Sequence, residues 1–313
     1  MTGKMSSFRC CHVLVLVLIH TCSGVSELSY SIDHTYYTMS LYQDNAEKMY
    51  EKHFVDMSNS HKHDFLSSQS QGAEKIEPGF IFPFYGHLVH NFYVTTHGFI
   101  SFAPRIHNLM YKTQYIAPLR VKLDPSRAEE STVNYKVHGP FGNSLTVQWT
   151  NVSVAEPYEH PLGGNFTFQV FYNDVHISKA FKLSDSSLMT LAFSFQATLH
   201  ANGDIVFVYV FVPDLLTTDA LYDNEPVAGL SDAFLIGDSE LHVYHTLNVD
   251  NPDIRTKSVI VFNAKPTCIR QTSCDACINL SKTSEFTCSY CPAVHRYTSF
   301  QIQSNSRVFV NQN

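Results

Sequence analysis

Residues 191–212 read LAFSFQATLHANGDIVFVYVFV and contain two apolar strand candidates on either side of Asn202-Gly203. An Asn-Gly pair between two such runs is a strong hairpin signal, because both positions of the tight turn tolerate a positive φ. The second run, IVFVYVFV, is apolar at odd and even positions alike, which predicts a central strand covered on both faces. This stretch therefore indicates an antiparallel β fold.

The pattern of short strands continues along most of the chain. Apolar or alternating runs separated by Gly, Pro and Asn are typical of an antiparallel sandwich or barrel and not of alternating βα units. In residues 144–152, Leu145, Val147 and Trp149 alternate with polar residues, so we expect one buried face with Trp149 in the core. The other strand candidates are residues 79–86, 92–103, 131–137, 165–172 and 258–264.

Residues 25–78 are polar and weakly patterned. Residues 41–54 are a candidate for a short helix, and the Ser/His-rich stretch after them is expected to be a loop or a disordered linker. His53, His61 and His63 lack the Cys, Asp or Glu spacing of a metal site. We therefore expect a poorly ordered segment before the β domain.

The first 24 residues have the layout of a secretory signal peptide. Lys4 and Arg9 precede an apolar stretch from Cys10 to Ile19, and small residues follow up to Gly24. The apolar stretch is about half of the roughly 20 residues that a membrane-spanning helix requires. We expect cleavage after Gly24 rather than an uncleaved anchor, and no later stretch of this chain is long enough to be a membrane helix.

Three Asn-x-Ser/Thr sequons begin at Asn151, Asn165 and Asn279. Together with the signal peptide they predict an exported glycoprotein. Asn165 has the strand parity opposite to its apolar neighbours, which suits an exposed glycan. Asn151 shares the parity of Trp149, so a glycan at Asn151 requires the strand to end or bulge near Thr150.

Composition and motifs exclude several classes of function. The net charge is −7 and there is no basic stripe, which argues against nucleic-acid binding. The chain has no Gly-x-Ser-x-Gly, His-Glu-x-x-His, Walker or dinucleotide-binding motif, so we expect a protein without catalysis or a cofactor.

Two groups of polar residues resemble a catalytic site and a calcium site, but a structural role explains each group more simply. Ser231 and Asp232, in GLSDAF, have no histidine at a catalytic spacing, and we expect a turn or capping role for them. The scattered aspartates have no EF-hand loop around them, so calcium is the less favoured interpretation. These aspartates are Asp124, Asp204, Asp232, Asp250 and Asp253.

Many short motifs occur in the order seen in plexin domain-containing proteins. They are HTYY (34–37), FIFPFYGHLVHNFYVTTHGFISF (80–102), TQYIAPLRVKLDP (113–125), SFQATLHANGDIVFVY (194–209), GLSDAF (229–234), YHTLNVD (244–250) and PTCIRQTSCDAC (266–277). The chain resembles that family over roughly residues 33–297, and its middle part also resembles the extracellular domain of nidogen.

The resemblance implies a nidogen-like β domain at residues 79–264 and an extracellular protein ligand. Members of the family are type I single-pass glycoproteins of the cell surface. They have been proposed as receptors for pigment epithelium-derived factor and as nidogen binders. The expected function is recognition by a cell-surface receptor ectodomain. The alternatives are a secreted matrix or adhesion protein related to nidogen, a soluble decoy form of the receptor, or an uncharacterised extracellular hydrolase.

The chain departs from the family pattern at two places. FTFQ at 166–169 is echoed by FSFQ at 193–196. We expect residues 170–192 to form an inserted surface loop, or to be translated non-coding sequence, and residues 193–196 to take the family's strand. The family also continues through further cysteines, a membrane helix and a cytoplasmic tail, so the resemblance implies an incomplete ectodomain with an unstructured end at 298–313.

Five cysteines follow the three of the predicted signal peptide, which are Cys10, Cys11 and Cys22. They form two Cys-x-x-Cys pairs preceded by a single cysteine: Cys268, Cys274, Cys277, Cys288 and Cys291. Such pairs resemble a zinc ribbon, although the gap between them is shorter than usual. The oxidising secretory pathway favours disulfides instead.

The cysteine spacing resembles the plexin–semaphorin–integrin module, here partial, at residues 265–297. That resemblance implies disulfides Cys268–Cys288 and Cys277–Cys291. It leaves Cys274 unpaired, because its partner in the complete module is a later cysteine that this chain lacks. Bridges contribute most of the stability of such small modules, about 2 to 5 kcal/mol each.

Overall fold

The Asn202-Gly203 pair joins β15 (Ala192–His200) to β16 (Ile205–Phe211) in an antiparallel hairpin, as predicted. The computed structural model describes residues 28–43, 46–102, 113–154, 166–172, 175–181, 192–213, 227–236, 240–249, 254–291 and 296–300, and only the backbone of 28–29, 166–181, 236, 290–291 and 296–300 within them. The signal peptide, Asn165, Asp250, Asp253 and most of the predicted 298–313 tail lie outside these residues.

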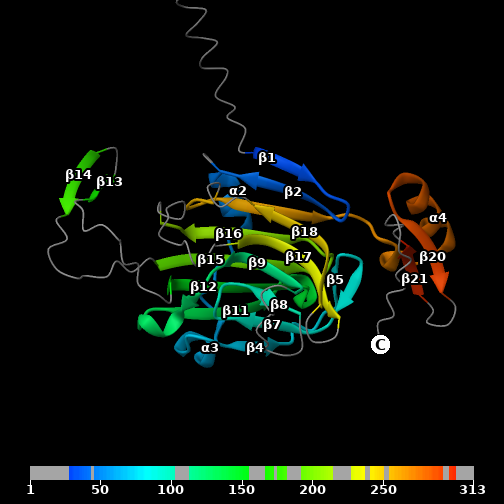
Figure 1. Cartoon of the computed structure of the whole chain (residues 1–313), viewed down its shortest axis with the longest axis horizontal. Coiled ribbons are helices and arrows are strands. Elements are labelled where there is room, and N and C mark those ends of the chain that lie inside the picture. The colour runs from blue at the N-terminus through cyan, green and yellow to red at the C-terminus, as the bar shows by residue number, and fades with distance from the viewer. Residues whose placement is uncertain are drawn as a thin grey trace, which may run out of the picture.

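Most of the described chain forms a sandwich of two antiparallel sheets (Figure 1). The larger sheet has the order β1-β2-β19-β16-β15-β12-β11-β3, and β10 also pairs with β12. Its other strands are β1 (Leu28–Asp33), β2 (Tyr37–Tyr42), β3 (His61–Lys62), β10 (Leu123–Asp124), β11 (Thr132–His138), β12 (Ser144–Val154) and β19 (Val259–Ala264).

The smaller sheet has the order β18-β17-β9-β8-β7-β4. Its strands are β4 (Ala73–Ile76), β7 (Phe92–Thr95), β8 (Ile100–Ser101), β9 (Tyr115–Arg120), β17 (Val227–Ile236) and β18 (Glu240–Val249). A separate hairpin is formed by β5 (Phe82–Phe84) and β6 (His87–Val89). The predicted fold class, mainly antiparallel β, is confirmed.

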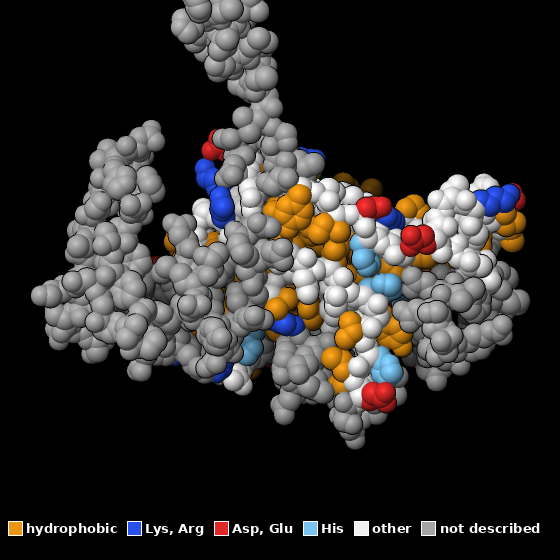
Figure 2. All heavy atoms as spheres, turned by 45° about the horizontal axis from the view of Figure 1, so that its top comes forward, with side chains coloured by type: hydrophobic (Ala, Val, Ile, Leu, Met, Phe, Trp, Pro, Cys, Tyr) orange, Lys and Arg blue, Asp and Glu red, His pale blue; other side chains and the backbone are white. Residues whose placement is uncertain are grey.

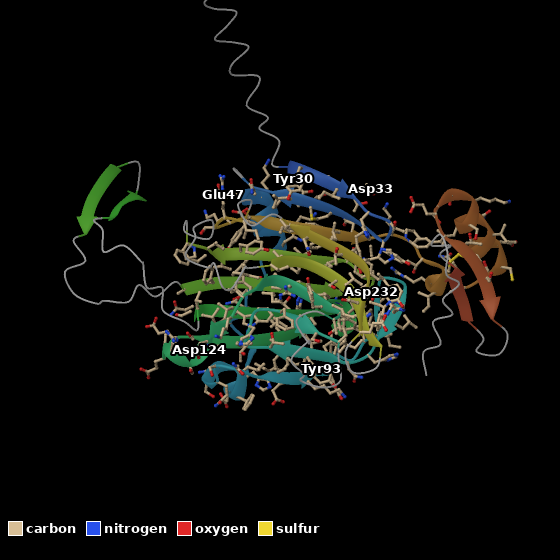
Figure 3. All side chains as sticks on the ribbon, viewed as in Figure 1. Tyr30, Asp33, Glu47, Tyr93, Asp124 and Asp232 are labelled. Atoms are coloured by element: carbon tan, nitrogen blue, oxygen red, sulfur yellow. A yellow bond between two sulfur atoms is a disulfide. The ribbon has the colours of Figure 1, made fainter. Side chains whose placement is uncertain are left out.

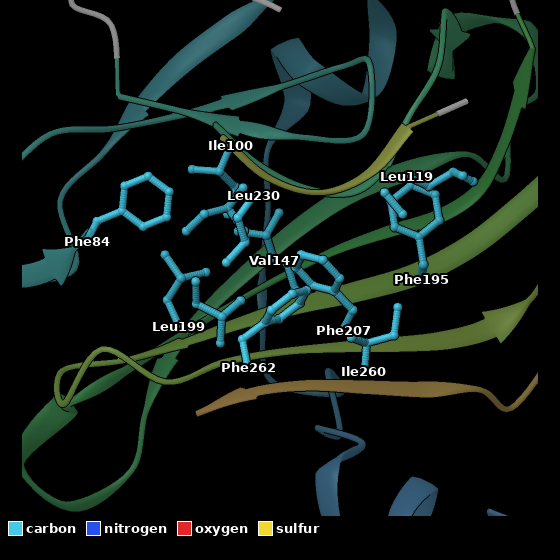
Figure 4. Packing of buried hydrophobic residues seen from close by; sticks show 14 of the residues in the cluster. Phe84, Ile100, Leu119, Val147, Phe195, Leu199, Phe207, Leu230, Ile260 and Phe262 are labelled. Carbon is cyan, nitrogen blue, oxygen red and sulfur yellow. The ribbon is translucent and has the colours of Figure 1, made fainter. Parts of the chain in front are cut away.

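One hydrophobic core fills the space between the two sheets (Figure 4). Phe195, Phe207 and Phe262 of the larger sheet pack in the same cluster as Ile100 and Leu230 of the smaller sheet. All five are fully buried, as is the only tryptophan, Trp149. The prediction that Trp149 lies in the core is therefore confirmed.

The strand β16 is covered on both faces, as its sequence predicts. Its residues Ile205, Phe207 and Tyr209 belong to the core between the sheets. Val206 and Val208 belong to a second cluster on the outer face of the larger sheet. Met49 and Tyr50 of α2 (Glu47–His53) pack against this second cluster, so the helix provides the outer cover.

The N-terminal segment differs from the expectation of poor order. Within it, β1 and β2 extend the larger sheet beside β19, and β4 pairs with β7 in the smaller sheet. In β2, Tyr37, Met39 and Leu41 are buried at every second position. The signal was missed because this alternation is short and its partner strand, β19, lies more than 200 residues later in the chain.

The repeated F-x-F-Q motifs occupy different places. Phe193 to Gln196 lie in β15, between β12 and β16 of the larger sheet. Residues 166–169 lie in β13 (Phe166–Tyr172), which pairs only with β14 (Val175–Phe181) in a two-stranded sheet of its own (Figure 1). Residues 193–196 therefore take a strand in the larger sheet, and their correspondence to the family's strand stays a prediction.

The strand β12 has a bulge at the sequon asparagine. Its register with β15 shifts between Trp149 and Val152, and both of these residues are fully buried. Asn151, between them, has a φ of 51° and a partly exposed side chain. The bulge interrupts the alternation of buried and exposed residues along β12. A glycan at Asn151 was expected from the sequence only if the strand ended or bulged near Thr150, and the bulge meets that condition.

A small C-terminal segment follows β19 at the edge of the sandwich (Figure 1). It contains η7 (Cys268–Arg270), the helix α4 (Cys274–Thr283), β20 (Thr287–Cys291) and β21 (Arg296–Phe300). The Cys268–Cys288 disulfide joins η7 to β20. No helix within the described ranges is both long and apolar enough to cross a bilayer.

Candidate functional site

Several turns gather at one end of the sandwich, which we name the loop end. They are residues 34–36 between β1 and β2, 85–86 between β5 and β6, 139–143 between β11 and β12, and 201–204 between β15 and β16. The strand register places three of these turns at the same end of the larger sheet, because His138–Ser144, Leu199–Ile205 and Tyr37–Ala264 are pairs at or near the strand ends beside them. The fourth turn lies beside them, because the Tyr85 ring centroid is 5.2 Å from that of Tyr37. Loops at the end of a rigid sandwich are frequent binding positions.

Five aromatic rings meet at the loop end, and we name them the junction cluster: His34, Tyr36, Tyr85, His245 and Phe286. The Tyr36 ring centroid lies 5.0 Å from Phe286, 4.9 Å from His245 and 5.4 Å from Tyr85. The Tyr85 and His245 rings are stacked, with centroids 5.6 Å apart. Because Phe286 belongs to the C-terminal segment, the cluster packs that segment against the sandwich.

The centre of the junction cluster is buried and its rim is exposed. Tyr36, Tyr85 and Phe286 are buried, whereas His34 and His245 are partly exposed. Burial lowers the pKa of His34, and the neighbouring His245 lowers it further. The His34 imidazole is therefore held in its neutral form at a lower pH than a histidine in water.

Tyr85 has both an unfavourable backbone conformation and a buried hydroxyl. Its φ is 47°, in the left-handed region, and its hydroxyl is buried without a hydrogen-bond partner among the described residues. Burial raises the pKa of Tyr85 and that of the neighbouring Tyr37 well above the ordinary range. Both hydroxyls thus stay protonated, and the rings contribute packing surface rather than charge.

Asp232 is buried beside the junction cluster and has two partners. Gln114 Nε2 donates a hydrogen bond to its Oδ1 at 2.7 Å, and His87 Nε2 lies 3.4 Å from its Oδ2. Ser231 and Asp232 are within β17, so the predicted turn or capping role is wrong. Figure 3 shows Asp232 and Asp33 at the end of the sandwich that is close to the C-terminal segment.

Polar contacts also connect the C-terminal segment to the sandwich. Thr35 Oγ1 donates to Glu285 Oε2 at 3.0 Å, and Arg270 donates to the carbonyl of Asn202. Lys265 follows β19, and its Nζ lies 2.7 Å from Asp33 Oδ1. Figure 2 shows acidic, histidine and hydrophobic side chains together on this part of the described surface.

A small pocket lies between these contacts. It is lined by Tyr36, Tyr37, Pro83, Tyr85, Gly86, Ala264, Lys265, Thr267 and Arg270. The Thr267 hydroxyl is buried and has no partner among the described residues. Both cations of the lining are already engaged, Lys265 with Asp33 and Arg270 with Asn202.

Phe141 projects from the tip of the β11–β12 hairpin. It is the most exposed of the described large hydrophobic residues, and its φ of 61° is in the left-handed region. The tip lies next to the β15–β16 turn, because Ala201 N donates to Asn143 O at 2.8 Å. An exposed aromatic ring in a strained turn is a candidate anchor for a partner.

The cysteines are placed as follows. Cys268 and Cys288 form the disulfide that the family resemblance implies. Cys277 is a buried free thiol, so its implied bond to Cys291 is not formed in this structure, and the Cys291 side chain is not among those described. Cys274 is exposed at the start of α4.

Two of the three sequon asparagines are described. Asn151 is partly exposed at the bulge of β12, and its backbone N–H donates to Ser194 Oγ at 2.9 Å. Asn279 is exposed on α4, but the hydroxyl of its sequon serine, Ser281, accepts a bond from Cys288 N at 2.8 Å. Glycosylation of these residues stays a prediction.

The histidines and aspartates that were considered as metal ligands are either exposed or engaged in other hydrogen bonds. His61 is exposed on β3, and the His63 side chain caps α3 (Asp64–Ser68) by accepting from Leu66 N. Asp124 caps η2 (Pro125–Arg127), and Asp204 accepts from Ala264 N at 2.8 Å. Across the described ranges no three His, Cys, Asp or Glu side chains are grouped as a metal site would need.

Sequence reasoning missed a polar network on the outer face of the larger sheet. His138 Nε2 lies 2.7 Å from Thr146 Oγ1, which lies 2.8 Å from Thr198 Oγ1, and His200 Nδ1 lies 2.9 Å from Ser144 Oγ. The alternation of polar residues in β12 predicts a polar face. It does not reveal that Thr146 and Thr198 are buried there.

The chain was compared with known protein families. The family described as NIDO related matches residues 46–175, from the residue before α2 to the first residue of β14. No solved structure matched the chain. A nidogen-like domain is consistent with a matrix or adhesion role and with an extracellular or secretory-pathway location. The match therefore supports a nidogen-like domain in this part of the chain.

Proposed function

We propose that this protein is a non-catalytic extracellular recognition protein that binds a protein ligand through its loop end. The observation that carries the proposal is the gathering of four turns and the C-terminal segment at one end of a nidogen-like sandwich. A rigid scaffold that presents several turns together is suited to binding a macromolecule.

The chemistry of the loop end favours binding by packing. Phe141 offers a fully exposed ring, and aromatic side chains are frequent hot spots of protein interfaces. The junction cluster fixes the C-terminal segment beside the turns, which pre-organises a composite surface. Pre-organisation lowers the entropic cost of association.

The motifs that resemble plexin domain-containing proteins supply four of the five rings of the junction cluster. His34 and Tyr36 come from HTYY, Tyr85 from the FPFYG part of the long motif and His245 from YHTLNVD. This supports the proposal that the chain is the ectodomain of a cell-surface receptor of that kind. By that resemblance, its ligand is a matrix protein such as nidogen, or pigment epithelium-derived factor.

The test is a binding measurement with the secreted full chain. Nidogen and pigment epithelium-derived factor are immobilised separately, and the affinity of the wild-type chain is compared with that of Phe141→Ser and Phe211→Ser. Phe211 is a matched control because it is half-exposed at the opposite end of β16. We expect Phe141→Ser to weaken binding about tenfold or more and Phe211→Ser less than about twofold.

Two results would contradict the proposal. One is equal loss of affinity in both variants, and the other is the absence of binding to either ligand. Receptor and secreted forms are distinguished by sequencing full-length transcripts across residues 170–192 and past Tyr297. A membrane helix encoded downstream supports the receptor, and the same stop in every transcript supports a secreted matrix or decoy protein.

A further inference from the structure

The short turn between β1 and β2 carries several contacts of the C-terminal segment. Thr35 Oγ1 donates to Glu285 Oε2 at 3.0 Å, and the Tyr36 ring centroid lies 5.0 Å from that of Phe286. The backbone N–H of Lys265, where the chain leaves β19 for the segment, donates to Tyr36 O at 2.9 Å. The seating of the segment on the sandwich therefore depends on the conformation of this turn.

The His34 side chain holds the turn in shape. The backbone N–H of Tyr36 donates to His34 Nδ1 at 3.2 Å, in the manner of an Asx turn, where a side chain accepts from the N–H two residues later. His34 N also donates to Tyr37 O at 2.9 Å and closes the turn. An imidazole nitrogen accepts a hydrogen bond only through its lone pair, so the bond from Tyr36 exists only while Nδ1 carries no proton.

The surroundings of His34 disfavour a positive charge on its ring. The ring is partly exposed, and its centroid lies 5.4 Å from that of His245. Burial lowers the pKa of His34, and His245 and Lys265 lower it further. The carboxylates of Glu285 and Asp33 raise it, but the net effect is a lowered pKa. The neutral ring that the hydrogen bond requires is thus also the form that the surroundings favour.

His245 faces His34 from β18. Its ring centroid lies 4.9 Å from that of Tyr36 and 5.6 Å from that of Tyr85, and its cross-strand partner in β17 is Asp232. Histidine is the side chain that ordinarily changes charge between pH 5 and 8. Acid therefore favours positive charge on two neighbouring rings, and like charges at this distance repel.

We propose that His34 is a proton-sensitive latch that loosens the C-terminal segment from the sandwich when the pH falls below about 6.5. A proton on Nδ1 removes the acceptor of the Tyr36 N–H and leaves two donors facing each other. The turn then loses the bond that shapes it, and Thr35 and Tyr36 are no longer held against Glu285 and Phe286. Because the seated form binds this proton less tightly than the loosened form, acid shifts the equilibrium towards loosening.

The size of the effect is limited by the other contacts of the segment. Leu280 and Phe286 belong to the main core cluster, and loosening has to expose part of that surface. The Cys268–Cys288 disulfide keeps η7 and β20 joined in either form. One histidine with an ordinary pKa of about 6.5 changes the equilibrium by at most about 25-fold between pH 7 and pH 5. Acid therefore raises the fraction of molecules with an open junction and does not detach the segment completely.

The latch is a property of the free chain and does not rest on the proposed ligand binding. Its consequence for binding does rest on that proposal. If the loop end binds a protein, opening of the junction disassembles part of the composite surface, and affinity falls in acid. The experiments below contain no ligand, so the latch and the proposed function succeed or fail separately.

The first experiment follows backbone amide exchange of the free wild-type chain at pH 7 and pH 5. Site-resolved mass spectrometry reads the amides of Tyr36 and Lys265, and rates are corrected for the pH dependence of unprotected amides. We expect both to exchange about threefold to 25-fold faster at pH 5. Amides of β16 should stay at least about tenfold slower at both pH values, which shows that the sandwich is still folded.

Two results of this experiment would overturn the latch. One is a change of less than about twofold at Tyr36 and Lys265. The other is exchange of the β16 amides as fast as these two, which means that the whole sandwich opens. Phe286→Ala removes the seat of the segment and should speed exchange of Lys265 already at pH 7. If it does not, the turn and the segment are not coupled and the proposal fails.

The second experiment tests the assignment to His34. In His34→Asn the side-chain oxygen can accept the same N–H from Tyr36, but it takes up no proton at pH 5. We expect wild-type protection at pH 7 and a pH effect below about twofold. His61→Asn is the matched control, because His61 is exposed on β3, and it should keep the wild-type response.

The outcome of the second experiment is decisive in either direction. A wild-type pH response in His34→Asn would show that another group drives the opening. A junction that is already open at pH 7 in His34→Asn would show that ring packing, and not the acceptor at Nδ1, holds the turn. Either result overturns the role assigned to His34.

Discussion

The indole Nε1 of Trp149 donates a hydrogen bond to the carbonyl oxygen of Thr95 at 2.8 Å, and so connects β12 of the larger sheet to β7 of the smaller one. The same indole stacks on Phe195, with ring centroids 5.3 Å apart. One side chain therefore contributes both packing and a directional link across the core.

Trp149→Phe should lower the free energy of unfolding by about 2 to 4 kcal/mol. The substitution removes buried apolar surface and leaves the Thr95 carbonyl without its indole donor. Urea denaturation followed by far-UV circular dichroism measures the change. Tyr209→Phe is the matched control, because it removes only the hydroxyl that donates to Pro118 O at 2.6 Å, and should cost about 1 to 2 kcal/mol. A smaller loss for Trp149→Phe than for Tyr209→Phe would contradict this account.

Gly98→Ala should prevent normal folding or lower the free energy of unfolding by more than about 3 kcal/mol. Gly98 has a φ of 76°, and a Cβ there would lie 2.1 Å from Leu119 O and 3.0 Å from Phe195 Cζ. Gly79→Ala separates strain from collision, since Gly79 has a φ of 84° but no atom within 4 Å of an added Cβ. It should cost about 1 kcal/mol. Secreted yield and thermal melting compare the two variants, and equal effects would mean that the collision at Gly98 is relieved.

The protein should lose stability as the pH falls from about 7 towards 4. Burial lowers the pKa of five described histidines, which are His34, His53, His97, His138 and His200. In the unfolded chain histidines take up protons near their ordinary pKa of about 6.5, whereas the folded protein resists protonation until lower pH. The stabilisation is therefore complete above about pH 6.5 and declines as the pH falls through that value.

His53 provides a specific test of this pH dependence. Burial lowers its pKa to about 4, and its Nε2 is buried without a partner among the described residues. His53→Gln should reduce the loss of melting temperature between pH 7 and pH 4.5. The same substitution at His61, which is exposed, is the control and should leave the pH profile unchanged. If the melting temperature of His53→Gln falls between pH 7 and pH 4.5 by as much as that of the wild type, the lowered pKa of His53 is contradicted.

The bulge in β12 should make Asn151 a glycan acceptor. Asn151→Asp removes the acceptor and keeps a residue type that tolerates its φ of 51°. We expect the variant secreted from eukaryotic cells to lack one glycan that peptide N-glycosidase removes from the wild type. Intact mass spectrometry before and after the glycosidase measures this. If the untreated wild type and the untreated variant differ in mass only by the substitution itself, Asn151 is not modified.

Features that depend on neighbouring residues could be predicted from the sequence. The Asn202-Gly203 turn, the doubly covered strand β16 and the burial of Trp149 follow from local alternation and turn chemistry. The bulge at Asn151 could be stated only as a condition, because the parity of a strand does not show where the strand is interrupted.

Features that depend on distant partners could not be predicted. Residues 229–234 (GLSDAF), where a turn was predicted, lie within the strand β17. Gly229 is required there for a reason other than a turn. A Cβ on Gly229 would lie 2.2 Å from Leu247 O, so β17 requires glycine where β18 approaches closely. The junction cluster was also invisible, because its rings come from four separate turns and strands whose proximity only the folded chain creates.

The pairing of β2 with β19 has a consequence for biosynthesis. These strands join Tyr37–Tyr42 to Val259–Ala264, so the buried side chains of β2 have no neighbour on that edge until residues 259–264 have been synthesised. At about 5 to 20 residues per second, the ribosome needs roughly 10 to 45 seconds to make the intervening segment. During that interval the edge of β2 that faces β19 is unpaired, although β1 can pair with its other edge, and an open apolar edge is the kind of surface that chaperones protect.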